Sequence, residues 1–278
     1  GGLLDEVQIY NRPLSDCEIR NIYNAANGLS CEVCDNIAPT TTVETNPNAN
    51  NEGWSNSDVS VSLSAADDVG GSGVSQITYT ATGAQTIPST TVSGASANLT
   101  ITADGETTIS YSARDNAGNT EAAETLIIRI DRTAPGISCG TADAAWHANN
   151  VSIACTANDT LSGLANAGDG SFNLTTNVPA NSQTANASTD SRNVCDVAGN
   201  CATAGPISGN KVDKQPPNIS ITAPADGADY VLNQSISANY NCADGGSGVG
   251  GCVGPVASGS DIDTSSAGTK TFTIIATD

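Results

Sequence analysis

Two short motifs recur along the 278 residues of this chain, and their spacing constrains its fold more than any other feature. The first motif is an aspartate followed four residues later by a proline, at 35–39, 131–135 and 213–217. The three prolines are 96 and 82 residues apart. The second motif, Asp-x-Ala-Gly-Asn, occurs at 115–119 and 196–200. A period of this length predicts a series of similar small domains.

The pattern within each period is typical of β-strands. Val59, Val61 and Leu63 alternate with serines, which indicates a strand with one buried face. Glycine, proline, asparagine and aspartate separate about seven such runs in the best-defined period, as expected for an immunoglobulin-like sandwich. The predicted fold class is therefore all-β, with tandem immunoglobulin-like β-sandwiches. We name the predicted segments the leading segment (1–34), the first repeat (35–132), the second repeat (133–214) and the third, truncated repeat (215–278).

The repeats align with one another outside the two motifs as well. Trp54 precedes Asp67 by 13 residues, and Trp146 precedes Asp159 by the same number. The run from Ile236 to Asp244 is the counterpart in the third repeat. A Ser-Gly-apolar triplet then follows in each repeat, at 72–74, 162–164 and 247–249. By these motifs most of the chain resembles the tandem immunoglobulin-like repeats of large bacterial secreted and surface proteins.

The leading segment has a different character. Its matches to the C-terminal end of a laminin-G-like (concanavalin-type) jelly roll are Gly2, Leu4, Asp5, Glu6, Val7, Ile9, Tyr10, Asn11, Arg12, Leu14 and Ser15. A strand is expected there, followed by a short helix with Ile19, Ile22, Tyr23 and Ala26 on one face. Such a remnant cannot bury its apolar side chains alone, so we expect it to be loosely held.

Composition excludes several classes of partner. The net charge is −20, with 14% of residues charged, which argues against nucleic acid and anionic membrane surfaces. No apolar run approaches the roughly 18 residues that would span a bilayer, so we predict no membrane insertion of this segment. The chain has no methionine, opens within a strand-like run and closes where a further Ala-Gly-Asn hairpin would begin. We interpret it as a fragment of a longer protein.

Nine cysteines, clustered within single repeats, favour disulfides and an extracellular location, secreted or at the cell surface. Zinc is the weaker alternative, because Cys31 and Cys34 form the only close pair of zinc type. Alignment of the repeats places Cys139 at the position of Val43 and Cys155 at that of Leu63, on neighbouring strands. Cys195 and Cys201 lie across one hairpin turn. The predicted pairs are Cys139–Cys155, Cys195–Cys201, Cys242–Cys252 and Cys17 with Cys31 or Cys34, which leaves one cysteine without an assigned partner.

A set of oxygen-bearing side chains is the candidate metal site. Its members, expected to gather near domain ends, are Asp67, Asp68, Asp115, Asn119 and Asp131. Carboxylate and amide oxygens are ligands that Ca²⁺ prefers, so calcium is the one cofactor that the sequence suggests. The alternative is that these residues only form turns and caps, which the absence of an Asp-x-Asp-x-Asp ladder favours. If calcium stiffens the joints, a chelator lowers the melting temperature.

Catalysis finds little support in the sequence. The one histidine, His147, cannot complete a His-Glu-x-x-His site. Residues 246–251 match a Gly-x-Gly-x-x-Gly fingerprint without the helix that it requires, so a turn is expected. Trp54 and Trp146 are the large surfaces on which a sugar could stack, although their equivalent positions favour a structural role. We predict that this segment is not an enzyme.

The function that the sequence suggests is therefore mechanical. Sandwiches in series would act as a spacer or adhesive stalk of an extracellular bacterial multidomain protein. Its partners would be the neighbouring domains of the same chain, with a cell-surface glycan or protein as a further candidate. The alternative is an accessory region, for spacing or glycan binding, of a secreted carbohydrate-active enzyme.

Overall fold

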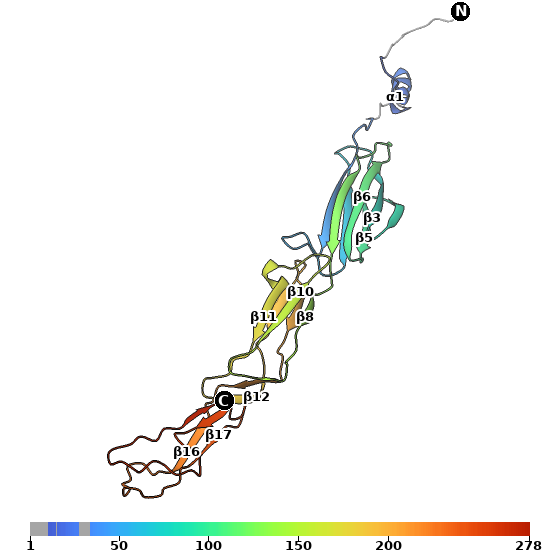
Figure 1. Ribbon diagram of the computed structural model, residues 1–278. Helices are drawn as coiled ribbons and strands as arrows, with labels where there is room; N and C mark the ends of the chain where they lie inside the picture. The colour runs from blue at the N-terminus through green and yellow to red at the C-terminus, as the bar shows by residue number, and fades with distance from the viewer. Residues whose placement is uncertain (1–10, 15, 28–33) are drawn as a thin grey trace, which may run out of the picture. The chain divides into compact units, whose positions relative to one another are not determined.

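The computed structural model describes residues 11–14, 16–27 and 34–278, and nearly all of its regular structure is β-strand (Figure 1). The chain divides into two compact units. The first extends to Thr133 and includes Val197–Asn200; the second consists of Ala134–Asp196 and Cys201–Asp278. The prediction of an all-β chain of tandem sandwiches is confirmed. The boundary between the second and third repeats, which share one unit, stays a prediction.

The first repeat consists of two antiparallel sheets, with strand orders β1-β2-β5 and β4-β3-β6-β7. The strands are β1 (Thr40–Asn46), β2 (Val59–Ala66), β3 (Val74–Gly83), β4 (Ile87–Ser93), β5 (Ser96–Ile101), β6 (Gly105–Asp115) and β7 (Glu124–Ile130). These are the seven strands that the hydrophobic alternation predicts.

The core of the first repeat is a single cluster with members from both sheets. Val59, Val61 and Leu63 of β2 are at most 1% exposed, because alternate side chains of a strand point to opposite faces. Its fully buried larger side chains also include Ile77, Ile101, Ile109 and Ile130. Burying large aliphatic side chains from two facing sheets is the main source of stability in a sandwich of this kind.

The chain enters and leaves the first repeat at opposite ends of its strands. Thr40, where β1 begins, pairs with Ala66, and the loop that follows β2 donates from Gly73 to Asp67 at the same end. Ile130, where β7 finishes, pairs with Gly105, at the start of β6. Because β6 spans the sheet from Gly105 to Asp115, its whole length separates the two ends of the repeat.

The second repeat has shorter strands. One sheet has the order β11-β10-β8, a second has the order β12-β15-β9, and β13 pairs with β14. The elements are β8 (Gly136–Cys139), β9 (Trp146–His147), β10 (Ser152–Asn158), the 3-10 helix η1 (Ala167–Gly170), β11 (Ser171–Thr175), β12 (Gln183–Ala187), β13 (Arg192–Cys195), β14 (Cys201–Ala204) and β15 (Asn210–Asp213). The main core cluster contains Cys155, Ala157, Phe172, Leu174, Val194 and Ala204.

The third repeat has the thinnest core. Its strands are β16 (Asn218–Ala223), β17 (Asn239–Ala243), β18 (Gly251–Val253) and β19 (Ile275–Thr277), which form two separate pairs. Within 215–278 the buried apolar residues are Ala238 and Ile274, whereas Val231 is 74% exposed. This small buried apolar area contributes little to the stability of the repeat. Interactions other than apolar packing must therefore hold these strands together.

Strand register confirms that the three repeats are built alike. The pair at the equivalent positions of the first two strands is Val43–Leu63 in the first repeat, Cys139–Cys155 in the second and Ile221–Tyr240 in the third. These are the positions that the sequence alignment makes equivalent. The first two pairs pack into their cores, whereas Ile221 is 43% exposed, so the third repeat keeps the register without burying the pair.

Disulfide bonds join Cys139 to Cys155, Cys195 to Cys201 and Cys242 to Cys252, the same pairs that the sequence predicts. Cys17 joins Cys34, one of its two predicted partners; Cys31 lies outside the described residues. Two of the bonds link residues that are directly opposite on neighbouring strands, Cys139 with Cys155 and Cys195 with Cys201. In the second repeat a covalent bond therefore takes the place of a large aliphatic pair.

The predicted helix of the leading segment is present as α1 (Asp16–Ala26). Its apolar side chains remain open to solvent, with Ile19 54% and Tyr23 67% exposed. Cys34 anchors the helix through its bond to Cys17. The strand expected at residues 2–11 lies almost entirely outside the described residues, so the laminin-G-like resemblance stays a prediction.

We expect that replacing both Cys139 and Cys155 by serine destabilises the second unit by about 3 kcal/mol, because the bond closes a loop of 16 residues. The double variant Cys139→Val/Cys155→Leu, which copies the pair of the first repeat, should recover part of this loss through apolar packing. Urea unfolding followed by circular dichroism measures both effects. Equal stability of the serine variant and the parent chain would contradict the prediction.

Candidate functional site

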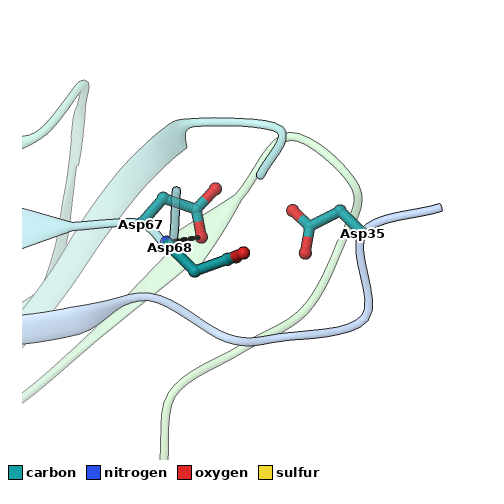
Figure 2. A group of neighbouring side chains, drawn as sticks. All are labelled: Asp35, Asp67 and Asp68. Atoms are coloured by element: carbon teal, nitrogen blue, oxygen red, sulfur yellow. Dashed lines mark hydrogen bonds between the residues drawn. The ribbon is translucent and has the colours of Figure 1, made fainter. Parts of the chain in front are cut away.

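Three carboxylates meet at the end of the first repeat where the chain enters it. Asp35 comes from the segment before β1, and Asp67 and Asp68 directly follow β2. One carboxylate oxygen from each lies within 4.8 Å of the others. Figure 2 shows the side chain of Asp35 facing those of Asp67 and Asp68 across the end of the sandwich. The sequence analysis placed Asp67 and Asp68 in the candidate site but used Asp35 only as a joint marker.

Backbone N–H groups satisfy most of these oxygens. Ser72 donates to Asp35 Oδ2 at 2.8 Å and Ile37 donates to Asp35 Oδ1 at 3.1 Å. Gly73 donates to Asp67 Oδ2 at 2.6 Å. The N–H of Ser72 is the main cause that holds the pKa of Asp35 below its ordinary value. The loop of residues 67–73 is therefore wrapped around the carboxylates of the joint.

The pKa of Asp68 is shifted in the opposite direction to that of Asp35. Partial loss of hydration, followed by the negative charges of Asp35 and Asp67, raises the pKa of the Asp68 carboxyl. Gly71 comes so close to this group that a Cβ on it would lie 2.6 Å from Asp68 Oδ1. A side chain at position 71 would therefore have to displace the carboxylates of Asp67 and Asp68, which lie close together.

Asp115 and Asn119 form the second part of this end. Asp115 is 2% exposed and its Oδ1 accepts from the N–H of Gly118 at 2.6 Å and of Asn119 at 2.8 Å. The side-chain amide of Asn119 donates to Asp115 Oδ2 at 2.6 Å and to the backbone oxygen of Asp35 at 3.3 Å. The Asp-x-Ala-Gly-Asn motif is thus a turn closed by its own aspartate, whose asparagine holds the incoming segment.

Asp131 does not join this group. It directly follows β7, at the end of the repeat that the chain leaves, and the length of β6 lies between it and Asp115. The sequence predicts only that Asp131 lies near a domain end, and in the structure it follows β7, which runs the length of the sheet back to the end opposite Asp115. Asp131 is instead the counterpart of Asp35. Each accepts from the N–H two residues later, Thr133 at 3.0 Å in the case of Asp131.

The two tryptophans occupy equivalent structural positions. Both are half-buried and lie at a short parallel contact with the last strand of their repeat, Trp54 directly before it and Trp146 within it. Ser55 bridges Ile130 in the first repeat, and β9 pairs with β15 in the second. Lys211 Nζ lies 6.0 Å from the centroid of the Trp146 ring. These contacts hold each tryptophan within its own sandwich.

His147 forms a hydrogen-bonded pair with Asp143, whose two carboxylate oxygens lie 3.0 and 3.1 Å from Nε2. The pair lines an open hollow of about 420 Å³ that also includes Asn150 and Ser152. In the part of the chain that the structure describes, no hydroxyl hydrogen-bonds the imidazole. The pair therefore lacks the nucleophile contact of a serine triad.

Two further sequence interpretations can be placed in the structure. Residues 246–250 lie in the connection between β17 and β18, which contains no helix, and Gly251 begins β18, in agreement with the turn interpretation. Among the described residues no helix has the length and apolar character needed to cross a membrane. Metal binding by Asp67, Asp68, Asp115 and Asn119 stays a prediction.

Comparisons with known proteins add little. A scan against protein-family models finds no match, and a search of curated proteins finds none either. Among solved structures, the fibronectin(III)-like modules of CbhA from Clostridium thermocellum match with a TM-score of 0.30 and 16% sequence identity. The match covers 62% of this chain and 93% of that chain.

The Asp115→Ala variant should destabilise the first repeat by about 2–4 kcal/mol, because it leaves three N–H donors of a closed turn without their charged acceptor. Glu44→Ala, at an exposed position of β1, serves as the control and should change stability by less than about 0.5 kcal/mol. Urea unfolding gives the free energies, and amide hydrogen exchange at 116–119 locates the change. Similar values for the two variants would contradict the assigned role of Asp115.

Proposed function

We propose that this chain is a spacer segment of an extracellular multidomain protein. The observation that carries the proposal is the geometry of the first repeat, in which the chain enters at the Asp35 end and leaves at the Asp131 end. A domain with this arrangement adds its own length to the chain that it interrupts. A domain whose ends lay side by side would add almost none.

The length gained for each repeat follows from strand geometry. Strand β6 has 11 residues, and a rise of about 3.3 Å per residue gives about 36 Å for the first sandwich. The longest strands of the second and third repeats, β10 and β16, have 7 and 6 residues and give about 23 and 20 Å. Three repeats in series would then extend for about 80 Å. At the joint before the first repeat, the N–H of Ser72 donates to the carboxylate of Asp35 and fixes the incoming segment. A fixed joint supports the addition of the length of each repeat to that of the next segment.

Two properties support an extracellular setting. Four disulfide bonds link described cysteines, and disulfides persist in oxidising compartments. The bonds are also most useful where apolar cores are small, as in the second and third repeats. A bacterial cell-surface or secreted parent protein is the setting that the repeat resemblance suggests.

A second candidate is an accessory region of a secreted carbohydrate-active enzyme that binds glycan. Two open polar hollows in the second unit favour it, since both include Asn150 and are lined by hydroxyl, amide and carboxylate groups of the kind that bind sugars. A glycan array probed with the intact chain tests this function. Binding that Asn150→Ala abolishes would support it, and an array without signal would remove it.

Small-angle X-ray scattering of the chain tests the spacer function. Three sandwiches in series should give a radius of gyration above about 23 Å, as for a rod of about 80 Å. A single compact body of this many residues would have a radius of about 19 Å. A measured value near the smaller figure would overturn the proposal.

A further inference from the structure

The joint between the second and third repeats lies within one compact unit, the second. Two adjacent residues form its centre. Asp213 ends β15, and Lys214 follows it directly. Their side chains bond to different repeats, that of Asp213 to the third and that of Lys214 to the second.

The carboxylate of Asp213 is held by the third repeat. Its Oδ2 accepts from the N–H of Ser247 at 2.7 Å and from the Ser247 hydroxyl at 3.0 Å. Asp213 is buried, and the N–H of Ser247 is the main cause that holds the pKa of its carboxyl below the ordinary value. These bonds tie the end of β15 to the connection between β17 and β18.

The side chain of Lys214 turns back to the second repeat. Its Nζ donates to the backbone oxygen of Val178 at 2.8 Å and to Oδ1 of Asn150 at 3.0 Å. The backbone N–H of Lys214 donates to the backbone oxygen of Ser182 at 3.0 Å. Asn150 Oδ1 also accepts from the N–H of Val178 at 2.9 Å, so the acceptor of the lysine is itself fixed.

The connection from Lys214 to the third repeat has little freedom to bend. It consists of residues 215–217, after which β16 begins. The N–H of Gln215 donates to Asp213 Oδ1 at 3.0 Å. Pro216 and Pro217 each have a fixed φ, and Pro216 also restricts the residue before it. A hinge needs residues whose backbone dihedral angles can change, and this connection offers few of them.

The same contact occurs where the chain leaves the first repeat. Arg132 follows the joint aspartate there, and its guanidinium donates to the backbone oxygen of Thr102 at 2.6 Å. It also pairs with Asp58 and Asp104, each at 2.8 Å. The spacing from the tryptophans makes Asp58 the counterpart of Asn150. A basic side chain after the joint aspartate therefore contacts the equivalent position of its own repeat in both cases.

We propose that Lys214 is a positioning residue that makes the second and third repeats move as one body. Domains joined by a short segment are otherwise expected to move relative to each other. Here neighbouring side chains are held by opposite repeats, so bending at the joint has to break the hydrogen bonds of Asp213 or of Lys214. The inference rests on the proposed spacer function, because a spacer keeps its length only if its joints resist bending.

Residual dipolar couplings of the isotope-labelled full chain, aligned in a dilute liquid crystal, test this role. Repeats that move as one body share one alignment tensor, so a single tensor should fit the amides of 134–213 and of 218–278. The Lys214→Met variant keeps the length of the side chain and removes its donors. Its two repeats should require separate tensors that differ in magnitude by about twofold or more, because hinge motions on the microsecond scale average the couplings.

Two further variants separate the role of Lys214 from a general effect of losing a lysine. Lys214→Arg restores a charged donor, as Arg132 provides at the first joint, and should return the chain to a single tensor. Lys270→Met is the matched control and should keep the single tensor. The Nζ of Lys270 makes contacts of the same kind, to the backbone oxygen and Oδ2 of Asp263 at 2.8 and 3.0 Å, but both lie within the third repeat.

The outcomes distinguish this role from the spacer function. A single tensor for Lys214→Met, equal to that of the parent chain, overturns the proposal. Separate tensors in the parent chain also overturn it, and the spacer function then still depends on the radius of gyration. A radius near that of a compact body together with a single tensor would overturn the spacer function and leave the role of Lys214 in place.

Discussion

The hydrogen bond between the joint aspartate and the Ser-Gly turn is the interaction on which the repeats depend. Ser72 makes it to Asp35 in the first repeat and Ser247 makes it to Asp213 in the third. It fixes the segment before the first strand against the loop that follows the second strand. Once the segment before the first strand is fixed to this loop, the first two strands can pair in only one register. The register determines which of their side chains point inward. Two motifs that are far apart in sequence are thus the two halves of one contact.

What fills the inward positions then changes from repeat to repeat. The first repeat places Val43 against Leu63 within a large aliphatic cluster, and no disulfide joins its strands within the described chain. The second replaces this pair with a disulfide, and the third combines few buried apolar residues with the bond between Cys242 and Cys252. Apolar burial and covalent links therefore substitute for each other on one framework, as expected when a core is too small to stabilise a domain by itself.

Alternation of apolar residues and repeat alignment were sufficient to predict the strands of the first repeat and three cysteine pairs, because both depend on local period and register. The candidate site was harder to predict from the sequence. Asp35 was not among the predicted candidate residues because its carboxylate meets Asp67 only after β1 and β2 have paired, a contact that no local pattern reports. The sequence does not show at which end of the repeat Asp131 lies, because that depends on β7 returning the chain to the end opposite Asp115.

The disulfides within single repeats have a consequence for a chain held at both ends. When a pulling force separates the strands of the second repeat, the segment from Cys139 to Cys155, which spans a sequence separation of 16, stays closed as a loop. An open stretch of that length would release about 50 Å of slack, at 3.3–3.6 Å per residue. The disulfide prevents this segment from extending. A chain held at both ends would therefore gain less length when each such domain unfolds, and it would refold from a shorter extension.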